Sequence, residues 1–419
     1  FIYSIIIMSD SMIIFQNNLT YKLPVPSSVT VNRTKKRSYF QNRTYTAQQT
    51  MVATLNTGSD FVDTKNSNLV IKLRAINKNS DLFQEGLGVG SAMNLVENVR
   101  INHRSGTQFS NIQKLNNWRV LQDRSCETST WFNTIGKVMG YDNSPDRFTS
   151  ASAVHTFVIP LCHVAPFFAG HGGVLLPPQM AAALRIELDT SPAGSIFQTT
   201  GTFPNVIDDY AIDDCYFDLE CVTLMDSASA SINTNAQKES LEYLYTDVFT
   251  SRSATPSNST SINVDVNKSV SYCEKVQAFI QPNAAIGNNV SDGFRNPYQP
   301  ASWWIALGSN YYPSNQRVED LEVAYMNHLT AYQKMKGKCG DRGQVDMTLD
   351  DFSTRYGTYT ACLELSDSLA LSAQPVTSSR TLRLEAHLDA PLAVDSTVIV
   401  YMNYLSSARS TLTSSRVDV

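Results

Sequence analysis

The sequence lacks any apolar run that approaches the roughly 18 to 20 residues needed to cross a bilayer. Its apolar start, Phe1 to Ile7, has no basic segment before it and no small-residue cleavage site after it, so we expect neither a membrane span nor a standard secretory signal. Charged residues are also scarce, at 17% of 419, against 42% hydrophobic residues. This composition predicts a folded chain with broad buried surfaces and excludes wholesale disorder, and the length predicts about two domains.

No C-x-x-C pair is present, although the chain has seven scattered cysteines. An odd number without metal-ligand spacing favours buried free thiols in a reducing compartment over a disulfide framework or a zinc site. His163 and His171, with Cys162 beside them, could bind a metal, but their spacing fits no helical or finger site. We therefore interpret them as structural residues.

Sequence motifs of catalysis are missing as well: there is no G-x-S-x-G, H-E-x-x-H or Walker sequence. The glycines at 86, 88 and 90 lack dinucleotide-binding spacing and precede a predicted strand. An acidic cluster could bind calcium but misses EF-hand spacing, and a solvated turn is favoured; it comprises Asp208, Asp209, Asp213, Asp214 and Asp218. We predict no enzyme activity, no catalytic residue, no cofactor and no metal site.

Acidic residues are absent from Ser11 to Ser59, where six Lys and Arg residues give a net charge of +6. The whole chain carries −5, so the remainder carries −11. A basic arm before an acidic body predicts contact with a polyanion, although an ordinary solvated strand and loop remains the alternative. Pro24 and Pro26 favour an extended arm. The candidate polyanion contacts are Arg33, Lys35, Lys36, Arg37 and Arg43, and Lys22 completes the +6.

The coarse secondary structure is mostly strand. Apolar residues alternate from Leu69 to Ile76 and from Ile262 to Asn267, which marks strands with one buried face. Two segments instead show helical spacing, at 107–124 and 319–336. Other predicted strands are 93–102, 155–165, 184–189, 215–225, 242–250, 272–281, 302–309, 358–366, 382–389 and 396–404.

The order of these elements occurs twice. Each half has a strand, a turn with glycine, a helix and three further strands, and Leu184 to Asp189 nearly repeats Leu382 to Ala386. A period of about 200 residues is typical of a duplicated domain rather than a solenoid. Each half would hold about eight strands and one mid-domain helix, which favours an antiparallel jelly roll. The fold class predicted is all-β: two tandem eight-stranded antiparallel jelly rolls, each with a flanking helix after its central strand.

We place the boundaries between these parts from composition. A polar, Ser/Ala/Asn-rich stretch separates the halves. The predicted parts are an N-terminal basic arm at 1–43, the first jelly roll at 44–226, a linker at 227–240, the second jelly roll at 241–405 and a C-terminal tail at 406–419.

Several short segments resemble the double jelly-roll major capsid proteins of icosahedral double-stranded DNA viruses, of the polinton-like virus and virophage type, and more remotely the adenovirus hexon. The similarity in the order of elements covers residues 44 to 405, whereas similarity of the amino-acid sequence itself covers some 50 residues. Its segments are His155 to Cys162, Pro166 to Phe168, Leu175 to Pro178, Leu184 to Leu188 and Gly308 to Pro313.

The resemblance implies a structural protein of the virion, assembled in the host cytoplasm or nucleus. It implies a homotrimer that forms pseudo-hexagonal capsomers and tiles a shell around a double-stranded DNA genome. Implied partners are further copies, neighbouring capsomers, penton and minor capsid proteins, and packaged DNA or an inner membrane met by the basic arm; no small-molecule substrate is implied. The alternative is a tandem β-sandwich that binds or processes carbohydrate, with a sugar platform at Trp303, Trp304, Tyr311 and Tyr312.

Overall fold

The computed structural model describes most of the chain in fifteen segments. Lys22, His171 and Cys339, along with Phe1 to Ile7, lie outside them. The described residues are 30–77, 85–87, 91–141, 154–170, 175–193, 196–199, 207–239, 241–283, 300–313, 317–335, 347–353, 359–362, 374–377, 380–410 and 415–418.

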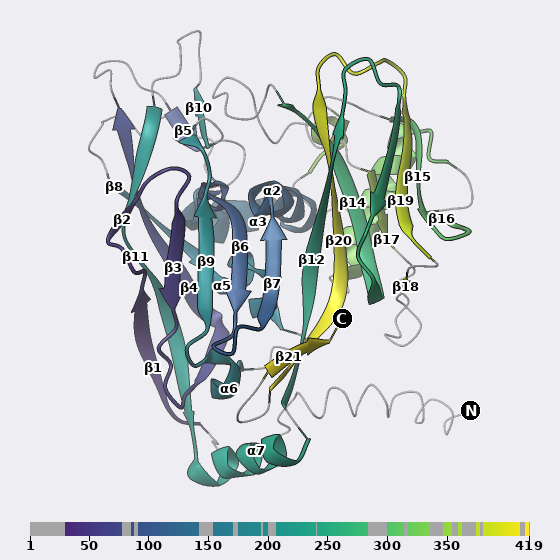
Figure 1. Cartoon of the computed structure of the whole chain (residues 1–419). Helices are drawn as coiled ribbons and strands as arrows, with labels where there is room; N and C mark the ends of the chain where they lie inside the picture. Colours follow the sequence, from purple (N-terminus) through teal and green to yellow (C-terminus); the bar gives the residue numbers. More distant parts are fainter. Residues whose placement is uncertain are drawn as a thin grey trace.

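The first half of the chain forms two antiparallel sheets of four main strands (Figure 1). In hydrogen-bonded order, one sheet holds β1 (Thr30–Tyr39), β11 (Ile207–Leu224), β4 (Phe61–Asn77) and β8 (Val154–Pro160). The other holds β3 (Thr50–Thr54), β9 (Arg185–Thr190), β6 (Val96–Asn102) and β7 (Gln108–Gln113). Three short strands accompany these sheets. β2 (Thr44–Tyr45) pairs with β11, and β5 (Glu85–Leu87) and β10 (Phe197–Thr199) form a separate two-stranded sheet.

The second half repeats this arrangement. One sheet holds β12 (Leu241–Thr255), β20 (Ser396–Ser410), β14 (Val270–Pro282) and β17 (Tyr359–Cys362). The other holds β13 (Ser261–Val266), β19 (Leu382–Leu388), β15 (Pro300–Leu307) and β16 (Asn310–Tyr312). Two short strands extend the first of these sheets, β18 (Gln374–Val376) on β14 and β21 (Ser415–Asp418) on β20.

The strand order confirms two tandem jelly rolls. When the eight main strands of each half are numbered along the chain, the two sheets run 1-8-3-6 and 2-7-4-5 in both halves. The first and last strands of each half therefore pair, which is the jelly-roll connection. The two similar sequence segments, Leu184 to Asp189 and Leu382 to Ala386, fall on β9 and β19, the seventh strand of each half.

The helices obey the same duplication. α2 (Leu115–Cys126) follows β7, and α8 (Leu321–Met335) follows β16, so each comes after the fifth strand of its jelly roll. The predicted helix at 319–336 is confirmed. The shorter helical segments are η1 (Ala92–Leu95), α3 (Ser129–Trp131), the π-helical η2 (Phe132–Gly136), α4 (Lys137–Met139), α5 (Leu161–Val164), η4 (Pro166–Ala169), α6 (Pro178–Ala181) and α9 (Leu349–Asp351).

The predicted helix at 107–124 is wrong in its first third, because residues 108–113 form strand β7. Gly106, with φ of +87°, makes the turn that lets β7 pair with β6. Phe109 and Ile112 are buried from this strand rather than from a helix. The predicted strand 155–165 likewise ends at Pro160, where α5 begins.

Three predicted boundaries differ from the structure. Residues 30–39 of the expected arm form β1, which pairs with β11 along the edge of the first jelly roll. The polar stretch expected to be a linker forms α7 (Asp226–Glu239) below that jelly roll (Figure 1). Part of the expected C-terminal tail extends β20 to Ser410 and adds β21.

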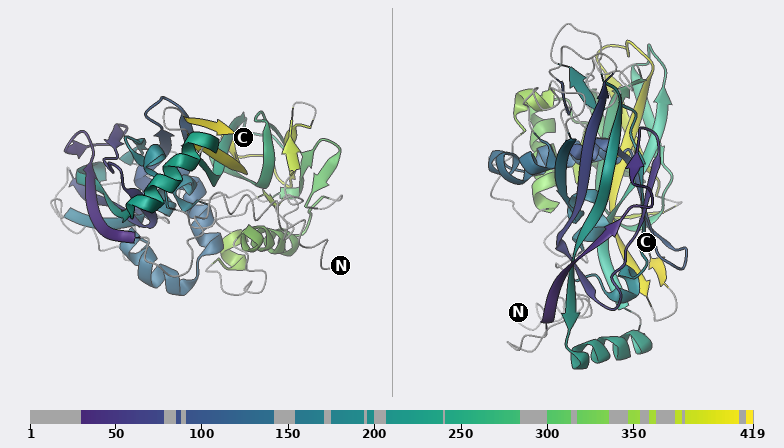
Figure 2. Two further views of the ribbon diagram at one scale, coloured as in Figure 1. Left: turned by 90° about the horizontal axis from the view of Figure 1, so that it is seen from below. Right: turned by 90° about the vertical axis from the view of Figure 1, so that its left-hand side faces the viewer.

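A continuous hydrophobic core fills both jelly rolls. Leu69, Ile71 and Leu73 point inward from β4, as the alternation predicted. Seen from below, the jelly rolls stand side by side, and α8 and the helical segments near α2 lie on one face of the pair (Figure 2). Among the residues described, no helix is long and apolar enough to span a membrane.

Candidate assembly surfaces

The predicted polyanion contacts come together on and beside β1, but each has a partner within the same jelly roll. Arg33 lies 3.0 Å from Asp63 and 3.9 Å from Glu220, so it bridges β1 to β4 and β11. Lys35 lies 3.3 Å from Asp218 on β11. These partners lie 30 to 187 residues away in sequence. The cations therefore fasten the edge strand, and sequence periodicity could not pair them with their carboxylates.

The remaining cations of the set follow the same rule. Lys36 lies 2.7 Å from Asp60, and this hydrogen bond raises the pKa of Lys36. Arg43 lies 2.8 Å from Asp214 and is mostly exposed to solvent. The guanidinium of Arg37 sits 4.7 Å from the centroid of the Tyr216 ring, a cation–π contact. The five positive charges of this set thus lie close to a comparable number of carboxylates. The net charge of this part of the folded surface is therefore close to zero.

Three members of the acidic cluster take part in such ion pairs, and the side chain of Asp208 lies outside the described part of the structure. Asp213 pairs with Arg74 at 3.2 Å, and Asp214 and Asp218 pair with cations of the basic segment. Asp213, Asp214 and Asp218 are engaged by Arg and Lys side chains of the same chain, which favours the predicted solvated turn at a strand over a calcium site. No group of metal-binding side chains occurs within the described segments.

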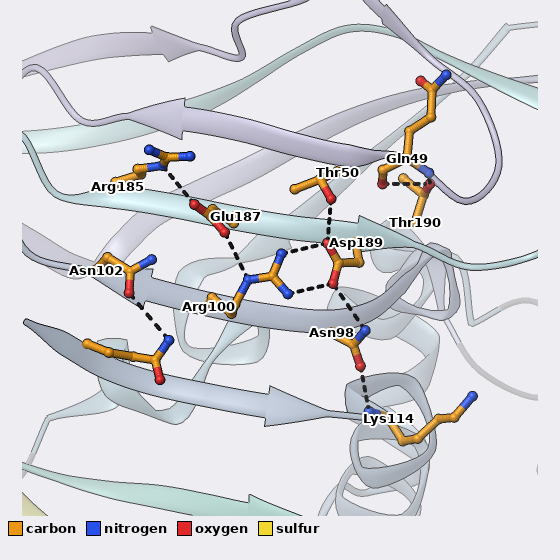
Figure 3. Close-up of polar contacts among 11 residues, drawn as sticks. Gln49, Thr50, Asn98, Arg100, Asn102, Lys114, Arg185, Glu187, Asp189 and Thr190 are labelled. Atoms are coloured by element: carbon orange, nitrogen blue, oxygen red, sulfur yellow. Dashed lines mark hydrogen bonds and ion pairs between the residues drawn. The ribbon is translucent and has the colours of Figure 1, made fainter. Parts of the chain in front are cut away.

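The outer face of the β3-β9-β6 sheet carries a polar network (Figure 3). Arg100 on β6 holds both oxygens of Asp189 on β9 at 2.8 and 2.9 Å and donates a third bond to Glu187. Thr50 on β3 adds a 2.7 Å hydrogen bond to Asp189, and Arg185 pairs with Glu187 at 2.7 Å. Burial alone would raise the pKa of Asp189, but its bonds to Arg100 and Thr50 hold it below the usual value. This face is therefore charged but internally satisfied.

The junction between the jelly rolls buries polar groups from both. Strand β12 of the second lies beside β7 of the first (Figure 1). The hydroxyl of Ser110 on β7 donates to one oxygen of Asp247 at 2.6 Å, and Tyr404 on β20 donates to the other at 2.8 Å. Burial raises the pKa of this carboxyl. Thr250 and Tyr401 also donate to backbone carbonyls of the first jelly roll.

Aromatic side chains fill the adjoining part of the junction. Phe167 of η4 packs against Tyr243 and Tyr245 of β12, with ring centroids 5.3 and 4.9 Å apart. The Tyr243 hydroxyl donates to the Phe167 carbonyl at 2.8 Å. Gly170 has φ of +52°, and a Cβ there would lie 2.7 Å from that hydroxyl. The first jelly roll therefore approaches β12 closely at a position that only glycine fits.

Helices α2 and α8 meet across the same junction. Ser125 of α2 and His328 of α8 are hydrogen-bonded at 2.7 Å in a buried site. Burial lowers the pKa of His328 to about 3, so its imidazole is neutral. Lys275 of β14 donates to Gln122 of α2 at 3.0 Å, and burial raises the pKa of neighbouring Glu274 to about 7. Buried hydrogen bonds and aromatic contacts thus connect the two jelly rolls.

His163, one of the two histidines considered as metal ligands, belongs to a buried polar network. His163 contacts Arg119 and Asp123 of α2, while Tyr141 donates to Asp123 at 2.7 Å. Burial alone would raise the pKa of Asp123, but the charge of Arg119 holds it far below the usual range. Burial lowers the pKa of His163, and its ring stacks on Trp131. This arrangement connects α2 to α5 and to the residues that follow α4.

The candidate sugar platform is divided between core and surface. Trp303 and Tyr312 are buried. Trp304 and Tyr311 stack on each other with centroids 4.0 Å apart, and Arg317 covers Trp304 at 4.5 Å. The ring faces are thus engaged within the chain, which favours a packing role.

Comparison with known proteins supports the architecture. No family model and no curated protein sequence matches the chain. A solved structure of the PBCV-1 virus capsid is similar with a TM-score of 0.64 at 14% identity, over 96% of this chain and 100% of that one. The Faustovirus major capsid protein gives 0.60 at 9% identity, over 97% and 98% of the two chains, and the mavirus major capsid protein gives 0.54 at 9%, over 96% and 93%. The chain has the double jelly-roll fold of these proteins.

Proposed function

We propose that this chain is the major capsid protein of an icosahedral double-stranded DNA virus. The observation that carries the proposal is the double jelly roll, whose similarity to the PBCV-1 capsid chain covers 96% of this chain and 100% of that one. Its work would be assembly rather than catalysis, because its buried polar clusters serve packing at the junction and under α2.

The proposed mechanism is formation of a homotrimer that works as a pseudo-hexagonal tile. The Ser110–Asp247 and Ser125–His328 contacts hold two jelly rolls side by side as one block. Three such blocks related by a threefold axis place six jelly rolls around a ring, which suits a sixfold lattice position. Neighbouring capsomers, penton and minor capsid proteins would then be the further partners, in a virion assembled in the host cytoplasm or nucleus.

The basic set remains our proposed contact with packaged DNA or with an inner membrane. Arg33, Lys35, Lys36, Arg37 and Arg43 would have to exchange their intramolecular partners for phosphates. Binding should therefore be weak, independent of sequence and steeply salt-dependent. Lys35→Ala should lower the salt slope by about one unit if Lys35 contacts phosphate, and an unchanged slope would remove Lys35 from the contact.

The assembly proposal is tested by mass and by microscopy. Light scattering of the purified protein should give three times 46.4 kDa, about 139 kDa. Electron micrographs should show hexagonal tiles or closed shells. A strictly monomeric protein at micromolar concentration would contradict the proposal.

A further inference from the structure

Two helical segments present apolar side chains to solvent in the same pattern. Ile135 of η2 and Val138 of α4 are 46% and 53% exposed, and Val323 and Met326 of α8 are 46% and 42% exposed. The members of each pair are three residues apart, so they lie on one side of their helical segment. We name these the α4 patch (Ile135 and Val138) and the α8 patch (Val323 and Met326).

Each segment also buries other side chains inside the chain. Phe132 and Met139 are buried against the first jelly roll, and Ala324 and His328 are buried against the second. Apolar side chains that stay exposed on a docked helical segment favour a further contact that removes them from water. Both views of Figure 2 place α8 and the helical segments near α2 on one face of the molecule. The exposed side chains of the two patches therefore belong to elements on the same face.

The charges beside the patches differ in sign. Lys137 is exposed and directly precedes Val138 in α4. Glu319, Asp320 and Glu322 are exposed at and before the start of α8, beside Val323. A contact of each patch with its own copy would oppose like charges, whereas a contact between the two different patches opposes unlike charges. Contacts between two different surfaces generate rings when the rotation closes.

We propose that the α4 patch of one copy packs against the α8 patch of the next copy, with Lys137 facing Glu322. Three such contacts close a ring in which the helical faces surround the threefold axis. The number three rests on the proposed capsid function, while the identity of the mating surfaces does not. The partner at this face is thus a second copy of the same chain.

Zero-length cross-linking tests the contact directly. A carbodiimide joins a Lys amine to a carboxylate only when the two touch. Trimers assembled from mixed isotopically light and heavy chains should yield a Lys137–Glu322 peptide pair that contains one light and one heavy member. Pairs of uniform label only, or no pair at all, would overturn the assignment.

Charge reversal provides the second test. Lys137→Glu and Glu322→Lys should each weaken trimer formation, and the double variant should restore it, because every contact then regains opposite charges. Val138→Asp should raise the concentration at which the trimer dissociates by about tenfold or more. The matched control is Val394→Asp, because Val394 is an exposed apolar residue that belongs to neither patch. This substitution should leave assembly unchanged.

The outcomes separate this inference from the proposed function. Suppose that the wild-type protein is a trimer, that Val138→Asp is also a trimer at all concentrations, and that the mixed-label cross-link is absent. The capsid proposal would then stand, and the contact between the α4 patch and the α8 patch would be refuted. A wild-type protein that is monomeric refutes both. Circular dichroism and thermal unfolding of each variant show that a lost trimer does not reflect a lost fold.

Discussion

Ser110 of the first jelly roll donates a 2.6 Å hydrogen bond to Asp247 of the second, in a site closed to solvent. Tyr404 occupies the other oxygen of the same carboxylate. One buried side chain thus connects β7, β12 and β20 across the junction.

Replacing Asp247 by Ala should destabilise the protein by about 2 to 4 kcal/mol, because two buried hydroxyls lose their acceptor. Asp247→Asn keeps the shape and one acceptor and should cost less. Urea unfolding measures both. Asp265→Ala, which removes an exposed pair with Arg383, is the control and should change stability by less than about 1 kcal/mol. Equal losses at the two sites would contradict the importance of the junction.

Glu274 should make stability fall as pH rises. Burial raises its pKa from 4.5 to about 7 in the folded protein, so the folded state keeps a proton that the unfolded chain loses. Stability should decline between about pH 4.5 and 7, by up to about 3 kcal/mol. Glu274→Gln should remove this decline and be the more stable protein at pH 8 but not at pH 4. His328 titrates in both proteins, so their difference isolates Glu274. Parallel pH profiles would refute the assignment.

Gly170→Ala should disrupt the junction. A methyl group there would meet the Tyr243 hydroxyl at 2.7 Å, in addition to the strain of a positive φ. We expect a loss of about 2 to 4 kcal/mol in thermal unfolding. Gly106→Ala also has a positive φ but nothing within 4 Å, so it should cost only about 1 kcal/mol. If the two variants unfold alike, the close approach to Tyr243 is unimportant.

Truncation should distinguish an arm from a strand. Deleting residues 1–29 leaves β1 whole, and we expect the folded protein to survive. Deleting residues 1–37 removes most of β1, bares the edge of β11 and leaves Asp63 and Asp218 without their cations. That variant should misfold or aggregate in size-exclusion chromatography. A well-folded product of the longer deletion would show that β1 is dispensable.

Local patterns predicted much of this fold because strands with one buried face repeat every second residue. Leu69, Ile71 and Leu73 needed only their own spacing to be assigned inward. The same rule fails where spacing is ambiguous. Phe109 and Ile112 are three residues apart, which suits a helix, but pairing with β6 makes them part of a strand.

The sequence by itself determined the duplication, the strand content and the composition of the basic segment. Only the tertiary structure decided that Arg33 faces Asp63 and Glu220, that β1 is an edge strand, and that Ser110 meets Asp247. The physical reason is the separation along the sequence between the residues that interact. Side-chain alternation is a property of neighbouring residues, whereas charge pairing and junction contacts join residues 30 to 187 positions apart, and chain folding alone brings these together.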